Sequence, residues 1–318
     1  MERDKDLWAV VLAAGEGNRL RSLTTDKEGM WVPKQFCSID GGPSMLRSAL
    51  ERATRIVPRE KIVTIVAAGH SRWWESELRD FPQENIIVQP KNRGTAAGIL
   101  LPVLHIFHRA RGAKILVLPS DHAVTDEDIL RESVEGAVPS ANGVFNRMIL
   151  LGIQADRPET EYGWIVPASA AKGSVGSLER VGFFVEKPPR EAAIDLMRRG
   201  GLWNSFMLLG SASTYLRLYR RTQSELLWRL LIGLSDSTRR WRSDRLAAVY
   251  DGLPTLDFSR DILQRDVSHL WVLRVPPCGW NDLGTPERVA GRDLRIPPGV
   301  SCSPGVMTSI MVADARRG

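Results

Sequence analysis

The chain has 318 residues, of which 43% are hydrophobic and 25% are charged. This composition is close to that of an average soluble globular protein and excludes the collagen-like, fibrous and disordered classes. At about 150 residues per domain, the length corresponds to two domains or one large α/β unit, and the net charge of +6 suits anionic small molecules as well as nucleic acid.

Cysteine spacing and hydropathy indicate the compartment. Cys37, Cys278 and Cys302 lie far apart and form no CxxC pair, so we expect neither a zinc site nor a disulfide framework, and a reducing compartment fits. No uncharged apolar stretch approaches the ~18 residues of a membrane span. The apolar run Trp8–Ala14 follows a start that carries three acids, which is unlike a signal peptide. We therefore expect a soluble, cytoplasmic protein without membrane contact.

Short apolar runs alternate with longer amphipathic segments in the first half of the chain. The runs predict strands at Trp8–Leu12, Lys61–Val66, Asn85–Val88, Lys114–Leu118 and Met148–Ile153. Between them, apolar residues three or four apart predict helices at Met45–Arg55, Trp73–Arg79, Thr95–Arg109 and Asp126–Ala137. This alternation predicts a doubly wound α/β fold with a mostly parallel sheet, whose ligand crevice lies beyond the carboxyl ends of the strands.

The pattern becomes more mixed after Gly163. We expect strands at Trp164–Pro167 and Gly182–Val185 and helices at Arg190–Arg199, Leu216–Leu234 and Arg239–Val249. The stretch from Arg217 to Arg245 holds eight arginines and three acids, but we expect no exposed aromatic side chains among them and therefore no nucleic-acid binding. Residues 291–318 are rich in Pro, Gly and Ser and predict a short tail after a domain that spans residues 1–290.

A glycine-containing loop follows the first predicted strand. Gly15 and Gly17 can bring bare backbone amides against a phosphate or a base, although a tight strand-to-helix turn would use the same residues. Leu20 stands where a dinucleotide fingerprint needs its third glycine, which argues against a nicotinamide dehydrogenase. Arg19 and Lys34 place a guanidinium and an ammonium within reach of one polyphosphate, unless they are solvated surface cations.

Eight short segments occur in an order that resembles the sugar-phosphate nucleotidyltransferases, and most closely the mannose-1-phosphate guanylyltransferases. The resemblance covers roughly residues 7–290. The segments are the GEGNRL loop (15–20), PKQF (33–36), Asn92–Ala97, Pro119–His122, Glu161–Gly163, Val185–Pro188, Trp203–Ser205 and Trp280–Gly284. The implied fold is a Rossmann-like nucleotidyltransferase domain with a mixed sugar-binding lobe.

The resemblance implies attack by a sugar-1-phosphate oxygen on the α-phosphorus of a nucleoside triphosphate, with release of pyrophosphate. Such a transfer needs positioning and charge neutralisation, typically by Mg²⁺ on carboxylates. By family match Asp121 and Asp282 are the magnesium ligands, and the catalytic residues are Arg19, Lys34, Asp121 and Lys187. A strand-end turn or helix cap remains an alternative for Asp121, as does a turn for Asp282.

The resemblance also assigns the two substrates to separate groups of residues. The nucleotide would contact Ala13, Ala14, Gly15, Gly17, Gln89, Asn92 and Thr95, although Thr95 could be an ordinary helix N-cap. The sugar phosphate would contact Gly163, Glu186, Lys187 and Asn204, with Tyr162 and Trp203 as apolar faces. Adjacent side chains on a regular strand face opposite ways, so Glu186 and Lys187 need the strand to end at Pro188, and a solvated edge pair remains the alternative.

The expected activity is Mg²⁺-dependent transfer of GMP from GTP to mannose-1-phosphate. Guanine is preferred on the family pattern alone, since Asn18, Ser22 and a longer stretch between Arg19 and Lys34 depart from it. The rivals are a glucose-1-phosphate thymidylyl- or uridylyltransferase and a non-catalytic sugar-nucleotide sensor. We expect the partners to be a nucleoside triphosphate and a hexose-1-phosphate, and the sequence also permits a homodimer. His122 is expected only to pack or to form a hydrogen bond beside Asp121.

Overall fold

The computed structural model describes residues 4–17, 20–25, 29–141, 147–169, 174, 176–233, 243–289 and 294–295. Within these residues no helix has both the length and the apolar character that crossing a membrane requires. Cys37 and Cys278 are buried and belong to no disulfide among the described residues, while Cys302 lies outside those residues.

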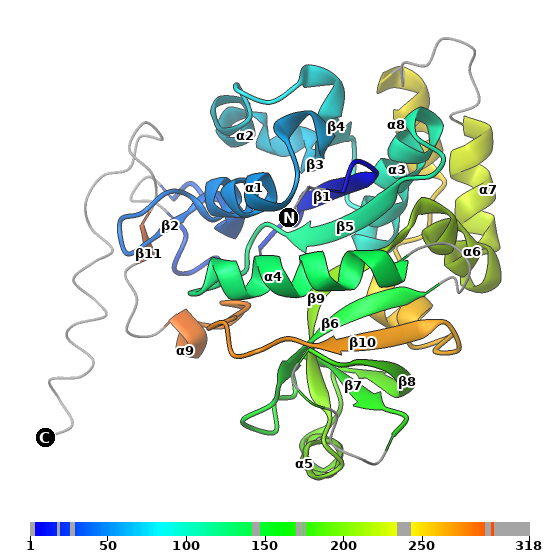
Figure 1. The fold of residues 1–318 in the computed structure, drawn as a ribbon. Coiled ribbons are helices and arrows are strands. Elements are labelled where there is room, and N and C mark those ends of the chain that lie inside the picture. Colours follow the sequence, from blue (N-terminus) through cyan, green and yellow to red (C-terminus); the bar gives the residue numbers. More distant parts are fainter. Residues whose placement is uncertain are drawn as a thin grey trace, which may run out of the picture.

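One nine-stranded sheet runs through the described chain in the order β4-β3-β1-β5-β9-β6-β10-β8-β7 (Figure 1). Its strands are β1 (Leu7–Ala13), β3 (Ile62–Ala67), β4 (Ile86–Gln89), β5 (Lys114–Pro119), β6 (Met148–Gln154), β7 (Gly163–Pro167), β8 (Leu178–Glu186), β9 (Leu202–Ser211) and β10 (Leu270–Arg274).

The first four strands of this order form a parallel region. β1 pairs in parallel with β3 and β5, and β3 pairs in parallel with β4. Side chains of β1 alternate between two cores: Ala9 and Val11 join one cluster, whereas Trp8 and Val10 join the other. Because both faces of a parallel sheet are covered by helices, its strands are apolar throughout rather than alternating. The doubly wound arrangement is confirmed for this region.

The other side of the sheet is mixed, so the prediction of a mostly parallel sheet is wrong there. β9 pairs antiparallel with β5 at its end and with β7 at its start, and it pairs antiparallel with β6 along much of its length. The β7–β9 pairing closes β9, β6, β10, β8 and β7 into a small barrel. Phe206 has a positive φ of 59° in mid-strand, where the register with β6 shifts. A bulge of this kind bends a strand, and here β9 passes from the open sheet into the barrel.

Helices cover both faces of the sheet (Figure 1). They are α1 (Met45–Ile56), α2 (Ser71–Glu77), α3 (Gly94–Arg109), α4 (Glu127–Ala137), α5 (Arg190–Arg198), α6 (Ala212–Thr222), α7 (Ser224–Gly233), α8 (Ser243–Asp251) and α9 (Pro286–Val289). The single helix expected over 216–234 is wrong, because Gln223, with φ −141° and ψ 57°, separates α6 from α7. The part of the last predicted helix before residue 243 lies outside the described residues.

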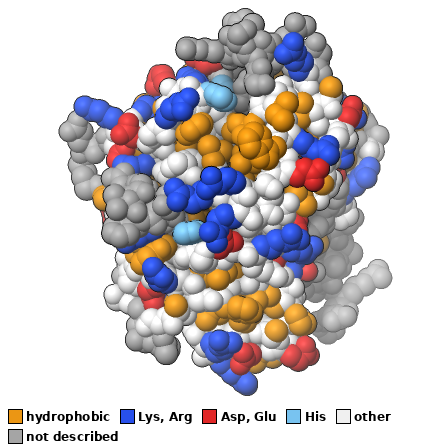
Figure 2. All heavy atoms as spheres, turned by 90° about the vertical axis from the view of Figure 1, so that its right-hand side faces the viewer, with side chains coloured by type: hydrophobic (Ala, Val, Ile, Leu, Met, Phe, Trp, Pro, Cys, Tyr) orange, Lys and Arg blue, Asp and Glu red, His pale blue; other side chains and the backbone are white. Residues whose placement is uncertain are grey.

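The arginine-rich stretch does carry an exposed aromatic side chain, contrary to expectation. Trp228 on α7 is 60% exposed and Ile232, one turn later, is 69% exposed. Figure 2 shows the side of the molecule to which α7 belongs, where apolar side chains stand among arginines and lysines. In the expected tail, β11 (Leu294–Arg295) pairs antiparallel with β2 (Ser38–Ile39), and the rest of that tail lies outside the described residues.

Candidate active site

A cleft of about 300 Å³ opens between the parallel region and the barrel, beyond the carboxyl ends of β1 and β5. A second hollow of about 410 Å³ adjoins it over the start of α3. The two share four lining residues: Leu12, Gly15, Thr95 and Asp257. They therefore form one continuous cleft. We call the hollow over the start of α3 the nucleotide side and the part that reaches the barrel the sugar side, after the substrates expected there from the sequence.

Asp121 lines the cleft wall, and the buried Lys34 contacts it from within the protein. Lys34 opens a short helical turn after Pro33, and its side chain is only 4% exposed. Its Nζ lies 3.2 Å from Asp121 Oδ2 and also donates to the backbone carbonyl of Asp282. Burial alone would raise the pKa of Asp121, but the Lys34 ammonium holds that pKa below its usual range. Asp121 is therefore a carboxylate that lines the cleft, with Lys34 on its Oδ2 only.

His122 lines the cleft beside Asp121. Its Nδ1 accepts a hydrogen bond from Trp280 Nε1 at 3.3 Å, and the two rings meet edge to face. Burial lowers the pKa of His122 to about 4, so the imidazole is neutral near pH 7. Its Nε2, which then carries the proton, lies 3.8 Å from Asp121 Oδ1. The expectation that His122 packs and forms a hydrogen bond is confirmed.

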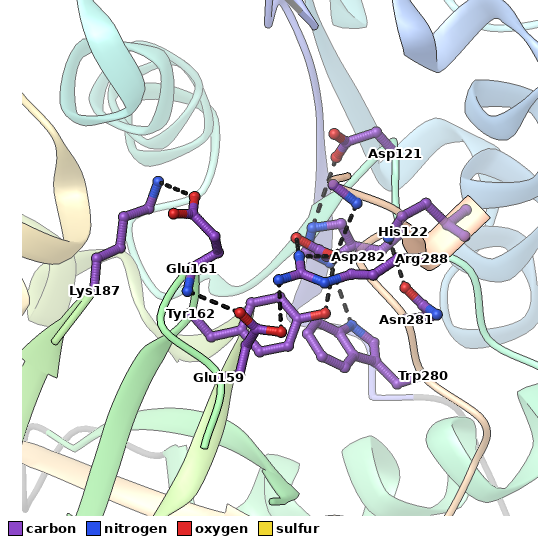
Figure 3. Close-up of polar contacts among 12 residues, drawn as sticks. Asp121, His122, Glu159, Glu161, Tyr162, Lys187, Trp280, Asn281, Asp282 and Arg288 are labelled. Carbon is purple, nitrogen blue, oxygen red and sulfur yellow. Dashed lines mark hydrogen bonds and ion pairs between the residues drawn. The ribbon is translucent and has the colours of Figure 1, made fainter. Parts of the chain in front are cut away.

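Asp282 is the most heavily bonded carboxylate of the site (Figure 3). Its Oδ1 accepts from the Tyr162 hydroxyl, the Gly284 amide and Arg288 Nη1, at 2.9, 2.9 and 2.8 Å. Arg288 Nη1 also lies 2.9 Å from Oδ2. Burial raises the pKa of Asp282, but the neighbouring cations, Arg288 among them, bring it below its usual range. Leu283, the next residue, has a positive φ of 50° and directs the chain back past the carboxylate.

Asp121 and Asp282 are typical of a Mg²⁺ site that is completed by substrate phosphates and water, and not of a metal site whose ligands all come from the protein. Within the described residues no cluster of three or more His, Cys, Asp or Glu side chains is placed to hold a metal. Mg²⁺ is usually bound through one or two carboxylates together with substrate phosphates and water. Asp121, a partly exposed carboxylate on the cleft wall, fits such a site, whereas Asp282 must share its oxygens with Arg288.

The nucleotide side begins at the glycine loop. Gln35 Nε2 donates to the carbonyls of Ala13 and Gly15, at 3.1 and 2.8 Å, and fixes the loop after β1. Gly17 has a positive φ of 65°, and a Cβ there would lie 2.9 Å from Lys34 N, so the position requires glycine. Ala14 and Gly15 line the nucleotide side and Gly17 lines the cleft, but Ala13 is fully buried and lines neither. Arg19 lies outside the described residues.

Gln89, Asn92 and Thr95 all line the nucleotide side. Gln89 is 2% exposed, and its Oε1 has no hydrogen-bond partner within the described part of the chain. Thr95 is not the N-cap, because α3 begins at Gly94, whose amide binds Asn92 Oδ1. The Thr95 hydroxyl instead accepts from the Phe258 amide at 2.7 Å and lies 3.3 Å from Asp257 Oδ2.

The sugar side brings together Gly163, Glu186, Lys187 and Asn204. Glu186 ends β8, and Lys187 follows it with a positive φ of 50°. This left-handed residue explains how two adjacent side chains line the same cleft. A Cβ on Gly163 would lie 2.6 Å from Glu186 Oε2, so the glycine makes room for the carboxylate. Burial and the nearby Asp257 raise the pKa of Glu186 to about 7.

Two aromatic residues expected at the sugar differ in their surroundings. Tyr162 lines the cleft, while Trp203 is 4% exposed and packs into the core against Tyr162, with ring centroids 5.1 Å apart.

Sequence reasoning missed Asp257, Ser259 and Phe206 in the lining, and Arg288 behind it. Asp257 reaches the cleft because backbone bonds join Leu256 to the start of α3, a pairing that no local pattern indicates.

Comparisons with known proteins agree with this architecture. The family model described as nucleotidyl transferase matches residues 8–290. The chain is 30% identical over 292 residues to the mannose-1-phosphate guanylyltransferase ManC of Salmonella typhimurium, covering 89% of this chain and 58% of that protein. It is 34% identical over 230 residues to the mannose-1-phosphate guanylyltransferase of Escherichia coli, covering 70% of this chain and 46% of that protein.

A solved structure is also similar. The crystal structure of a Thermus thermophilus protein, described as a mannose-1-phosphate geranyltransferase, superposes with a TM-score of 0.72 at 28% identity, covering 88% of this chain and 76% of that one. The chain spans about half the length of the curated relatives it matches.

Proposed function

The chain belongs to the nucleotidyl transferase family, and from that premise we propose that it transfers GMP from GTP to mannose-1-phosphate, giving GDP-mannose and pyrophosphate. The observation that carries the proposal is the two-sided cleft, in which Asp121 lines the wall and binds the buried Lys34 ammonium. The relatives named as mannose-1-phosphate guanylyltransferases support the choice of substrates.

The reaction is an in-line displacement at phosphorus. A phosphate oxygen of mannose-1-phosphate attacks the α-phosphorus of GTP, the bond from that phosphorus to the bridging oxygen breaks, and pyrophosphate leaves with the electron pair. No covalent enzyme intermediate is needed, so the protein contributes positioning and charge neutralisation. Asp121 would hold Mg²⁺, together with Asp282 if Arg288 releases one of its oxygens, and the ion would neutralise charge on the phosphates.

Residues on the nucleotide side would orient GTP. The backbone after β1, with Gly15 and Gly17, leaves room for phosphates, and Arg19 and Lys34 would supply positive charge. The free Oε1 of Gln89 supports recognition of a base that presents a donor, as guanine does with its N1–H and 2-amino groups. A buried acceptor without a partner is costly, so a ligand donor at this position is favourable.

Residues on the sugar side would orient the acceptor. Glu186 and Asn204 offer hydrogen-bond acceptors to sugar hydroxyls, and Lys187 offers its ammonium to the sugar phosphate. Lys187 Nζ lies 3.5 Å from Glu161 Oε2. The Lys187 side chain is 38% exposed, so it can turn toward an anion in the cleft. The attacking oxygen would then be held on the barrel side of the α-phosphorus.

Pyrophosphate release tests the proposal. Purified protein with Mg²⁺ is assayed with GTP, ATP, UTP and dTTP, each against mannose-1-phosphate and glucose-1-phosphate, with the Asp121→Asn variant as the control. We expect release that requires GTP and mannose-1-phosphate together and is lost in the variant. Release with another pair would reassign the substrates, and no release despite nucleotide binding would identify a sensor.

A further inference from the structure

Arg288 joins the buried carboxylate of Asp282 and the half-buried carboxylate of Glu159 behind the candidate metal site. It lies on α9, its side chain is 7% exposed, and its guanidinium carbon stands 4.2 Å over the ring centre of Tyr162. Nη1 contacts both oxygens of Asp282, at 2.8 and 2.9 Å, and Nη2 lies 2.8 Å from Glu159 Oε2. The carboxylate expected to bind Mg²⁺ and a carboxylate of the loop before β7 therefore share one guanidinium (Figure 3).

The contacts of Asp282 are unevenly divided between its two oxygens. Each carboxylate oxygen has about two lone-pair directions. Oδ1 receives three contacts, from Tyr162, Gly284 and Arg288, whereas Oδ2 receives one, from Arg288. Asp121, by contrast, is 39% exposed and has Lys34 on Oδ2. A divalent cation at Asp282 must consequently take over an oxygen that Arg288 now contacts.

The other end of Arg288 reaches the sugar side. Glu159 Oε1 accepts from the Glu161 amide at 3.0 Å, and the Glu159 carbonyl accepts from Trp164 Nε1 at 2.7 Å. These bonds shape the loop that carries Glu161 and Tyr162 and leads into Gly163 on the sugar side. If Arg288 moves away from Asp282, its contact with Glu159 changes as well, and Glu159 fixes the loop whose residues line the sugar side.

We propose that Arg288 is a positioning residue that competes with the divalent cation for Asp282 and ties the sugar-side loop, residues 159–163, to the metal state of that carboxylate. The inference rests on the proposed function, because it takes Asp121 and Asp282 as the metal site. If Arg288 merely held Asp282 in a metal-ready position, removing it would weaken metal binding. Competition predicts the opposite sign.

Direct binding of Mn²⁺, followed by electron paramagnetic resonance without nucleotide or sugar, measures that sign. In Arg288→Met, Asp282 and Glu159 lose their shared cation, and we expect Mn²⁺ to bind about tenfold tighter, since electrostatic interactions at buried sites are large. Arg157→Met is the matched control: Arg157 also lies near Glu159, at 3.6 Å, but none of its contacts reaches Asp282 within the described residues. Its Mn²⁺ affinity should match that of the wild type.

A second variant protects the test against unfolding. Arg288→Met with Glu159→Gln removes one charge of each sign and should retain the tighter Mn²⁺ binding. In either Arg288 variant that turns over, we expect KM for mannose-1-phosphate to rise several-fold and KM for GTP to stay unchanged, because the affected loop lines only the sugar side.

The outcomes separate the inference from the function on which it rests. Unchanged or weaker Mn²⁺ binding in a folded Arg288→Met or double variant, with pyrophosphate release intact in the wild type, overturns the inference alone. Mn²⁺ binding that survives Asp121→Asn and Asp282→Asn overturns the metal assignment, and the inference with it.

Discussion

The parallel region and the barrel meet at one cleft but are organised differently. In the parallel region, strand pairing and apolar cores place the residues of the nucleotide side, and Gln89 keeps a free acceptor there. In the barrel, side chains from distant segments contact one another around Asp282, Glu159 and Lys187. The nucleotide side is therefore set mainly by regular backbone pairing, with the bonds of Thr95 to Asp257 and Phe258 as its long-range polar contacts, whereas the sugar side depends on such contacts throughout.

Residues with strained backbone conformations gather around the cleft between the two regions. Among the described residues four that are not glycine have a positive φ, and three of them, Lys187, Phe206 and Leu283, line the cleft or follow Asp282. Such conformations cost about 1–3 kcal/mol each and persist where surrounding contacts determine them. Their position indicates that the barrel side gives up local stability to direct its side chains into the cleft.

The largest effect is expected at the junction of the two regions. Asp121→Asn keeps the size of the side chain but removes the charge that Lys34 and a metal share, so we expect kcat to fall about a thousandfold, as when a principal charge-stabilising group is removed. Steady-state pyrophosphate release measures it, with near-ultraviolet circular dichroism as a control for folding. A loss below tenfold would remove Asp121 from the metal site.

The next test asks whether the two sides act independently. Gln89→Leu removes the buried acceptor and should raise KM for GTP about tenfold, and Glu186→Gln should raise KM for mannose-1-phosphate by about ten- to a hundredfold. Each variant should leave the other KM within about twofold, since sites without shared contacts are additive. A variant that raises both KM values equally would show that the two sides behave as one site.

The difference between the regions also explains what the sequence could predict. Apolar runs located β1, β3, β4 and β5 to within about a residue at most ends, because β1, β3 and β5 are buried on both faces and β4, at the sheet edge, is still a short apolar run. β9 was not predicted, because Asn204, Ser205 and Gly210 interrupt its apolar pattern and its partners change along its length. β9 belongs both to the open sheet and to the barrel because it pairs with β5, β6 and β7, and no local stretch of sequence contains all three strands.

The same reasoning applies to the site. Ordered motifs identified Lys34, Asp121, Glu186 and Asp282, whose contacts the structure now shows. Arg288 carried no motif, since it is one of many arginines and its partner Glu159 is far away in the chain. Residues whose importance arises from a tertiary contact between distant segments leave no signal in the local sequence.

The pH dependence of stability should also distinguish the two sides, with a smaller effect than the substitutions above. The pKa of Glu186 is raised from 4.5 to about 7, so the folded protein binds more protons than the unfolded chain between these values. Stability should therefore fall by about 1–3 kcal/mol as pH rises from 4.5 to 7 and then level off. Glu186→Gln should lack this slope in urea unfolding measured across that range.

The same titration predicts a kinetic signature. Ionised Glu186 accepts hydrogen bonds from sugar hydroxyls better than the protonated acid, so KM for mannose-1-phosphate should fall several-fold as pH rises through about 7. KM for GTP should not follow this profile. An identical pH profile in Glu186→Gln would assign the titration to another group.

The smallest expected effect is on the nucleotide side, at Gly98 within α3. A Cβ there would meet only Gln89 Oε1, at an ordinary 3.9 Å, whereas a Cβ at Gly163 would meet Glu186 Oε2 at 2.6 Å. Gly98→Ala should therefore stabilise the protein by about 0.5–1 kcal/mol, because alanine in a helix loses less backbone entropy than glycine. KM for GTP should change by less than about threefold, because the added methyl group makes only this ordinary contact within the described residues. A rise well beyond that would place the base against Gly98, and the nucleotide side would then be as tightly fitted as the sugar side.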